Sequence, residues 1–242
     1  SLRQAARNGI ISKNPMDNTT PPKFKESRKG KALSAEVEKQ FLDAAKDSYY
    51  YPLYRMASLT GMRIGEVLGL QWQDVDFEHG EIHITHTLCY VPGRGQYLDA
   101  PKSEASRRII PMEKGSELYT LLKEWRSKQR LQKFKVGKYW QPLPGMEHIV
   151  FTSNHGTPHF DMNVRTDQRK IVAEMNEAGI NIDCTFHTLR HCFATRCIEN
   201  GMDPKVLQAI LGHSTFAMTM DLYCDVMEDT KRKELSKIMA AL

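Results

Sequence analysis

Strand-like alternation of apolar and polar residues is confined to the middle of a sequence whose other apolar residues recur at helical spacing. The alternation at 81–87 predicts a strand, and the turn residues at 92–95 predict a hairpin. Further short strands are expected at 107–110 and 149–151. Helices are expected from Ser34, over 49–59, 63–69 and 113–134, and from Asn163 onward. The expected fold is therefore mainly α-helical with a small antiparallel β-sheet.

Basic residues are concentrated in two blocks, although the net charge of the whole chain is only +5. Residues 1–31 hold 8 basic and 2 acidic side chains, and residues 101–138 hold 11 basic and 4 acidic ones. The rest of the chain is net acidic. Such blocks occur on solvated linkers and helix faces, but they are also typical of proteins that bind a polyanion. The charge pattern alone leaves both interpretations open.

The sequence disfavours secreted, membrane-spanning and metal-binding proteins. It has no apolar run of about 18 residues, and its start lacks the apolar stretch of a signal peptide. Its five cysteines form no CxxC pair, which argues against disulfides and zinc. His148, His155 and His159 lack the spacing and the acidic or thiol partners of a metal site. We expect an intracellular protein that uses no metal and no cofactor.

The first 31 residues predict the end of one folded unit followed by a basic linker. Asn14-Pro15, Pro21-Pro22 and the Lys/Arg-rich run after them are not compatible with a packed element. The chain opens without Met, in what reads as the remnant of a helix. We therefore expect that a preceding N-terminal domain is missing from this sequence.

Residues able to act on a phosphate group are spread over two distant regions. His187 and Arg190 are three apart on a predicted helix, so both side chains can reach one phosphate. Arg63 follows a break between two helices, with Glu66 one turn further on. Each of these residues alone is more typical of a surface position, and Tyr223 alone is more typical of half-buried packing. His191 is expected to face away from His187 and to serve packing.

Taken together, these residues belong to motifs that resemble those of the tyrosine recombinases, the integrase family of site-specific DNA strand-exchange enzymes. The first motif is Thr60-Gly-Met-Arg63-Ile-Gly-Glu66-Val-Leu-Gly-Leu70, followed by Trp72. The second combines Pro101-Lys102-Ser103 with Ser106-Arg-Arg-Ile-Ile-Pro111. The third is His187-Thr-Leu-Arg190-His191, continued by Leu211-Gly-His213-Ser214 and Tyr223. The resemblance covers about 32–242 and is strongest to integrases of phages and conjugative transposons.

The resemblance implies a catalytic-domain fold at 32–228, preceded in 1–31 by the end of a core-binding DNA-binding domain. It implies that Arg63 and Arg190 hold the non-bridging oxygens of the scissile phosphate, and that His187 and His213 donate hydrogen bonds to it. Lys102 would protonate the leaving 5′ oxygen, Tyr223 would be the nucleophile, and Glu66 would support the site. Basic residues expected to contact DNA are Lys23, Lys25, Arg28, Lys29, Lys31, Arg107, Arg108, Lys123, Arg126 and Arg130.

The resemblance also implies the reaction, the partners and the location. DNA would be cut through a 3′-phosphotyrosyl link and exchanged through a Holliday junction, for integration or excision of a mobile element. The partners would be double-stranded DNA, other protomers in a synaptic tetramer and an excisionase-type accessory protein, at the nucleoid in the bacterial cytoplasm. A tail helix at 229–242 would dock on a neighbouring protomer or fold back on its own core. A type IB topoisomerase-like activity and a catalytically idle DNA-binding module remain as alternatives.

Overall fold

The computed structural model describes residues 2–20, 32–101 and 104–241, and it divides into two compact units. The first unit, residues 1–30, contains the short helix α1 (Leu2–Arg7) and a 3₁₀ helix at Pro15–Asn18. Asn14 caps this 3₁₀ helix, because its side chain accepts a hydrogen bond from the backbone N–H of Met16. Neither helix contains a buried residue.

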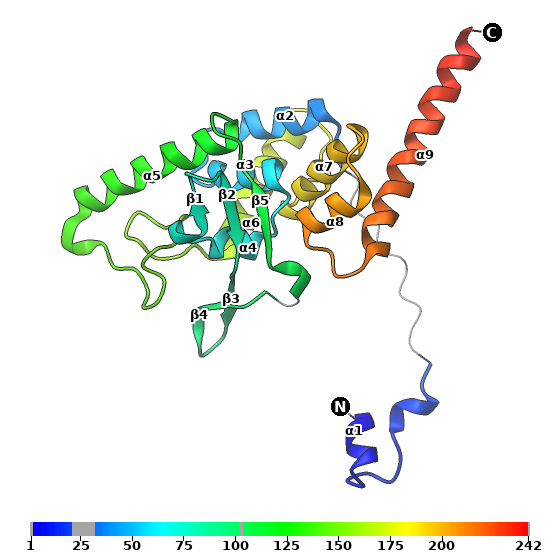
Figure 1. Ribbon diagram of the computed structural model, residues 1–242, viewed down its shortest axis with the longest axis horizontal. Coiled ribbons are helices and arrows are strands. Elements are labelled where there is room, and N and C mark those ends of the chain that lie inside the picture. Colours follow the sequence, from blue (N-terminus) through cyan, green and yellow to red (C-terminus); the bar gives the residue numbers. More distant parts are fainter. Residues whose placement is uncertain (1, 21–31, 102–103, 242) are drawn as a thin grey trace. The chain divides into compact units, whose positions relative to one another are not determined.

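The second unit, residues 31–242, is a helical domain with two small sheets (Figure 1). Its helices are α2 (Ala35–Ala44), α3 (Tyr51–Thr60), α4 (Ile64–Gly69), α5 (Glu117–Val136), α6 (Asp161–Glu177), α7 (Phe186–Glu199), α8 (Pro204–Leu211) and α9 (Phe216–Ala241). Its strands are β1 (Val75–Asp76), β2 (Glu81–Ile84), β3 (Thr87–Val91), β4 (Gly95–Asp99) and β5 (Arg108–Pro111). The helices expected at 49–59, 63–69 and 113–134 are thus present as α3, α4 and α5.

Apolar side chains from most elements of the second unit meet in one core. Helix α3 contributes Leu53, Tyr54 and Met56, all fully buried, and it packs directly against α7. The three-stranded antiparallel sheet β1–β2–β5 adds Ile82, which pairs with Ile110 across the strands. This register places both isoleucines on the buried face. The core therefore fixes α3, α7 and the sheet as one frame.

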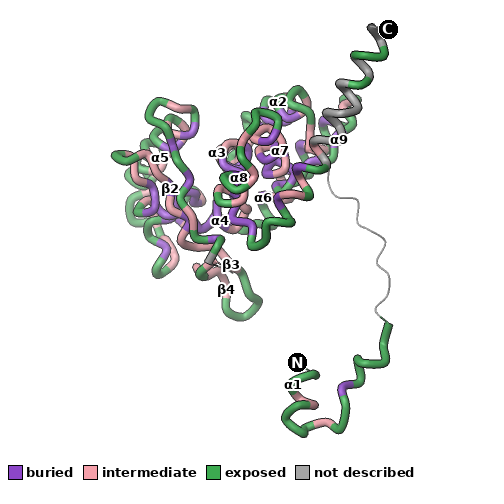
Figure 2. Tube along the Cα trace, turned by 45° about the vertical axis from the view of Figure 1, so that its right-hand side comes forward, coloured by how far each residue is buried: buried purple, intermediate pink, exposed green. Residues whose placement is uncertain are grey.

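A second apolar cluster holds the C-terminal helices together. Ala194 and Ile198 of α7, Leu207 and Leu211 of α8, and Tyr223 of α9 pack against one another. Buried residues recur along α7 in Figure 2, whereas the tip of the β3–β4 hairpin is exposed. In Figure 1 this hairpin projects from the edge of the domain opposite to α5. No helix among the described residues is both long and apolar enough to span a membrane.

One detail of the sequence prediction is wrong. Residues 149–151 do not form a strand, because Ile149 makes only an isolated bridge to Gln71. The helix that contains Tyr223, α9, continues without a break from Phe216 to Ala241. Accordingly, no helix boundary separates the expected tail at 229–242 from the nucleophile region.

Candidate active site

The turn that ends α8 is the centre of the site. Gly212 follows the helix at a φ of 64°, a left-handed conformation that favours glycine. A Cβ at this position would also lie only 3.0 Å from the carbonyl oxygen of Ala105 and 3.1 Å from the side chain of Arg108. The last carbonyl groups of a helix have no partner inside the helix and carry partial negative charge. This turn therefore presents several acceptors to cationic side chains.

Three arginines donate to three successive carbonyl oxygens at this turn. Arg108 Nε lies 2.5 Å from the oxygen of Ile210, and Arg190 Nη2 lies 2.8 Å from that of Leu211. Arg63 Nη2 completes the set at 3.1 Å from the oxygen of Gly212. The arginines come from β5, α7 and the start of α4, so the turn gathers guanidinium groups that are distant in sequence.

Arg63 is held by the helix that it begins. It caps α4, and its backbone N–H donates to Glu66 Oε2 at 2.9 Å while its Nη1 donates to Oε1 at 2.8 Å. Glu66 is 4% exposed. Its burial alone would raise the pKa of Glu66, but hydrogen bonds and positive charge from Arg108, together with Arg63, lower it below the usual value. Glu66 is therefore an anion at neutral pH that orients Arg63.

Arg190 is the most enclosed cation of the site. Its side chain is buried, and Nη1 donates to the carbonyl oxygen of Gly61 at 2.6 Å, at the end of α3. Burial lowers the pKa of Arg190 to about 9, and the charge of Arg63 acts in the same direction. Arg190 therefore stays charged at neutral pH, in surroundings where an anion would be attracted strongly.

Two histidines stand beside these arginines in the neutral form. Surrounding protein lowers the pKa of His213 to about 4, and the charges of Arg190 and Arg63 add to this effect. Its Nδ1 lies 2.9 Å from Thr219 Oγ1. The pKa of His187 is lowered to about 4 by the protein around its ring, then by His191, Arg190 and Arg63. Contrary to the sequence prediction, His191 does not face away, because its ring contacts that of His187 at a centroid distance of 4.6 Å.

Tyr223 lies apart from this cluster. Its hydroxyl donates to the carbonyl oxygen of Met202, and the side chain is 9% exposed within the second apolar cluster. Met202 precedes α8, whereas the arginines contact the far end of α8, roughly 12 Å away at the rise of an α-helix. Burial, followed by the charge of Asp203, raises the pKa of Tyr223. In this structure the phenol is a protonated donor held away from the arginines.

The other predicted site residues are distributed as follows. Lys102 and the predicted DNA contacts Lys23, Lys25, Arg28, Lys29 and Lys31 lie outside the described residues. Arg107, Lys123 and Arg130 are exposed. Arg126 places its guanidinium 5.3 Å from the centre of the Trp72 ring, so part of its role is packing. Arg108 is engaged inside the protein, which does not fit the DNA contact expected of it.

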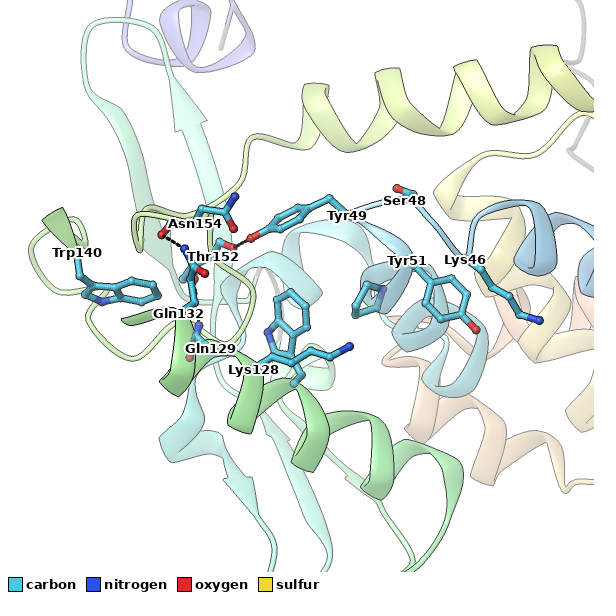
Figure 3. Close-up of a pocket in the computed structure, with 12 residues that line it drawn as sticks. Lys46, Ser48, Tyr49, Tyr51, Lys128, Gln129, Gln132, Trp140, Thr152 and Asn154 are labelled. Atoms are coloured by element: carbon cyan, nitrogen blue, oxygen red, sulfur yellow. Dashed lines mark hydrogen bonds between the residues drawn. The ribbon is translucent and has the colours of Figure 1, made fainter. Parts of the chain in front are cut away.

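A cavity of about 320 Å³ lies away from these residues, between α5, the start of α3 and the loop that contains Thr152 (Figure 3). Several of its polar groups are paired with one another. The hydroxyl of Tyr49 donates to the oxygen of Thr152 at 2.9 Å, and Gln132 Nε2 donates to the oxygen of Asn154 at 3.1 Å. No arginine or histidine of the described residues lines it. This cavity is therefore not the candidate active site.

Sequence reasoning did not find the convergence of the three arginines. The carbonyl acceptors at 210–212 are backbone groups, so no residue type reveals them. One signal was present, because Arg108 and the apolar Ile110 are two residues apart on the strand predicted at 107–110. Residues two apart on a strand share a face, so Arg108 lies on the same side as an apolar residue.

Comparisons with known sequences find proteins that are similar to this chain. The sequence profile described as "Phage integrase family" matches residues 31–229. A XerC-like tyrosine recombinase of Caldanaerobacter subterraneus subsp. tengcongensis is 32% identical over 241 residues, which cover 94% of this chain and 60% of that protein. The transposase of transposon Tn916 from Enterococcus faecalis is 29% identical over 250 residues, covering 97% and 58%.

A solved structure shows the same fold. The Tn1549 transposon integrase in complex with circular intermediate DNA matches with a TM-score of 0.75 and 29% sequence identity. The match covers 98% of this chain and 78% of that chain. The chain described here spans about three-fifths of the length of the curated relatives that it matches.

Proposed function

The chain belongs to the phage integrase family of tyrosine recombinases, and from that premise we propose that it is a site-specific DNA recombinase. It cleaves and rejoins DNA through a 3′-phosphotyrosyl intermediate and exchanges strands through a Holliday junction. The outcome is integration or excision of a mobile element, without metal or ATP. Relatives named as a transposon transposase and a phage integrase support this purpose.

The convergence of Arg63 and Arg190 on the end of α8 is the observation that carries the proposal. Both guanidinium groups are fixed by backbone carbonyls, so little reorganisation is needed when a phosphate arrives. Planar guanidinium groups match the oxygens of a phosphate and bind them in pairs. They would stabilise the negative charge that develops on the non-bridging oxygens at the transition state. Neutral His187 and His213 would donate the remaining hydrogen bonds.

The reaction conserves both charge and bond energy. The phenol of Tyr223 loses its proton and its oxygen bonds to phosphorus, while the bond from phosphorus to the 5′ oxygen breaks. The leaving 5′ oxygen takes a proton, for which Lys102 is the proposed donor. A phosphodiester is replaced by another phosphodiester, so the reverse attack by a different 5′ hydroxyl needs no external energy. This reversibility is what strand exchange requires.

The position of Tyr223 implies a step before cleavage. Its hydroxyl is bonded to Met202 at the opposite end of α8 from the arginines. Cleavage therefore requires that the hydrogen bond from Tyr223 to the carbonyl oxygen of Met202 is released and that the start of α9 moves toward His213. We propose that DNA binding and assembly with other protomers drive this movement.

The proposed assembly with other protomers is based on the end of α9, residues 229–242. Leu235, Ile238 and Met239 of α9 are exposed apolar residues. Docking of residues 229–242 on a neighbouring protomer would cover them and would couple active sites in a synaptic tetramer. An excisionase-type accessory protein and a position at the nucleoid, in the bacterial cytoplasm, complete the proposal.

The test uses the full chain and nicked duplexes tiled across the DNA that flanks its gene. A recombinase converts two duplexes into joined products, which native gels resolve, whereas a topoisomerase-like enzyme relaxes a supercoiled plasmid and joins no second duplex. Joined products that require Arg63 and Arg190 would support the proposal. Relaxation without joining would favour the topoisomerase, and binding without cleavage of any nicked duplex would favour the idle module.

A further inference from the structure

We propose that Arg108 is a positioning residue that keeps Arg63 available for the DNA phosphate, an inference that rests on the proposed function. It does so by neutralising Glu66 and by fixing the carbonyl turn at the end of α8. Its role is therefore internal and differs from that of a basic residue that touches DNA.

All three guanidinium nitrogens of Arg108 are engaged inside the protein. Nη1 lies 3.1 Å from Glu66 Oε1, and Nη2 lies 2.8 Å from Oε2, so Nη1 and Nη2 form a bidentate pair with the carboxylate. Nη1 also donates to the oxygen of Ser106 at 3.1 Å, and Nε donates to the oxygen of Ile210 at 2.5 Å. The side chain is 5% exposed. Bidentate pairing of this kind fixes orientation as well as charge.

Charge balance explains why the ion pair between Arg108 and Glu66 matters to Arg63. Glu66 faces two guanidinium groups, of which Arg63 is 38% exposed and Arg108 is buried. A buried carboxylate without a partner is costly, so Glu66 must be neutralised by at least one of them. With Arg108 present, the two guanidinium groups and the one carboxylate carry a net positive charge, and the exposed part of Arg63 can present it to an anion. Without Arg108, Glu66 would neutralise Arg63 and weaken the phosphate clamp.

Arg108 also determines where the clamp lies. It holds the carbonyl of Ile210, one residue before the carbonyl that binds Arg190 and two before the one that binds Arg63. Loss of this bond would loosen the turn to which both clamp arginines are anchored. The neighbouring Arg107 is exposed and has no such contact among the described residues, so it serves as the matched comparison.

The experiment compares Arg108→Met, Arg108→Lys, Glu66→Gln and the double variant Arg108→Met/Glu66→Gln with the wild-type chain. The first readout is the single-turnover rate of covalent adduct formation on the nicked duplex that the wild type cleaves, at saturating protein. We expect Arg108→Met to lower this rate by about 10- to 100-fold, the range of coupling between contacting charged residues. The double variant should regain part of the rate, because the carboxylate that would neutralise Arg63 is gone while the hydrogen bond to Ile210 remains lost. Arg108→Lys keeps the positive charge but cannot form the bidentate pair, so its rate of adduct formation should lie between those of the wild type and Arg108→Met.

The second readout is the salt dependence of duplex binding. The double variant Arg108→Met/Glu66→Gln should keep the wild-type slope of log K against log[salt], because Arg63 keeps its charge there, whereas Arg107→Met should reduce the slope by about one phosphate contact. A reduced slope in the double variant, or a double variant that forms adduct no faster than Arg108→Met, would overturn the proposal and return Arg108 to the DNA contacts.

The third readout is urea unfolding, which does not depend on cleavage. Arg108→Met should lower the free energy of unfolding more in the wild-type chain than in the Glu66→Gln variant, because only the wild type keeps a buried carboxylate that needs its charge. Additive effects of the two substitutions would contradict the pairing itself. A different result is possible, in which the two substitutions have non-additive effects on the free energy of unfolding but no protein, the wild type included, forms an adduct. This result would confirm the ion pair and would refute both the proposed function and the positioning role.

Discussion

Arg190 and Arg196 lie on the same helix and illustrate two different uses of a guanidinium group. Arg190 is anchored to the carbonyls of Gly61 and Leu211 at the candidate site. Arg196 pairs with the buried Glu38 and donates to the carbonyl of Ser58 at 2.6 Å. The first arrangement presents charge to a ligand, and the second joins α7 to α2 and α3.

Replacement of Arg190 by Gln should therefore lower the rate of DNA cleavage by about 10³-fold or more, the effect typical of an arginine that stabilises a phosphoryl transition state. The rate is measured as adduct formation on a nicked duplex at saturating protein. Arg196→Gln is the matched control, because it should lower stability by about 2 kcal/mol through the unpaired Glu38 while the folded protein keeps its cleavage rate. Equal loss of cleavage in both variants would show that the effect on Arg190 is merely structural.

His159 makes stability depend on pH. The residue is buried edge-on to Tyr49 and Tyr50, and its Nε2 has no hydrogen-bond partner among the described residues. Burial lowers the pKa of His159 to about 4, below its value in the unfolded chain. The folded state then binds fewer protons than the unfolded state between these two values. Stability should fall as pH decreases through this window and should be fully present above it.

Replacement of His159 by Phe tests this dependence, because Phe keeps the aromatic contacts and cannot be protonated. Urea unfolding at a series of pH values should show that the variant loses less stability than the wild type between about pH 6.5 and 4, by roughly 3 kcal/mol at most. His187 and His213 shift in the same direction, so part of the dependence should remain in the variant. Parallel curves for the two proteins would contradict the assignment to His159.

At the level of elements, two glycines of α4 allow the β3–β4 hairpin to pack on the helix that begins with Arg63. A Cβ on Gly69 would lie 2.7 Å from the backbone nitrogen of Leu88, whereas a Cβ on Gly65 would meet the side-chain oxygen of Thr87 at 2.5 Å. A hydroxyl can rotate away, but a backbone atom moves only with its strand. Alanine at Gly69 should therefore displace β3.

We expect Gly69→Ala to lower the free energy of unfolding by about 1–3 kcal/mol, the cost typical of overpacking. Gly65→Ala should cost less, because rotation of Thr87 relieves its closest contact, whereas the closest contact at Gly69 is a backbone atom. Urea titration of both variants measures the difference. A smaller loss in Gly69→Ala than in Gly65→Ala would show that the hairpin is not fixed by this contact.

Sequence periodicity predicted the elements better than the site. The helical spacing of Leu118, Leu121, Leu122 and Trp125 was sufficient to predict α5, since it reflects burial along one face. The apolar run Ile149-Val150-Phe151 was misleading, because it is buried in the core without pairing to a neighbouring strand. Apolar character indicates burial, but strand pairing depends on which backbone lies alongside.

The same limit applies to the candidate site. His187 and Arg190 were predicted to share a helix face because their spacing determines it, and α7 places both beside the cluster. The internal role of Arg108 and the contact of Tyr223 with Met202 depend on backbone carbonyls from other elements. No pattern of side chains encodes such acceptors, so these contacts required the tertiary structure.

For the whole molecule, we predict that the end of α9 is needed for assembly with other protomers and contributes little to DNA binding. Deletion of residues 229–242 should leave the affinity for duplex DNA largely unchanged in a gel-shift assay. It should reduce multimeric complexes and alter cleavage, because the exposed Leu235, Ile238 and Met239 are lost. A truncated chain that assembles and recombines like the full chain would show that the tail packs only on its own domain.

We propose that Tyr223 attacks the DNA phosphate, although its hydroxyl donates a hydrogen bond to the carbonyl oxygen of Met202 in the free protein. The most direct test incubates the full chain with a nicked duplex whose short 5′ product diffuses away, then denatures the mixture and maps the DNA-bearing peptide by mass spectrometry. We predict one adduct, on Tyr223, that is absent from Tyr223→Phe. An adduct on another residue, or undiminished adduct formation by Tyr223→Phe, would contradict it.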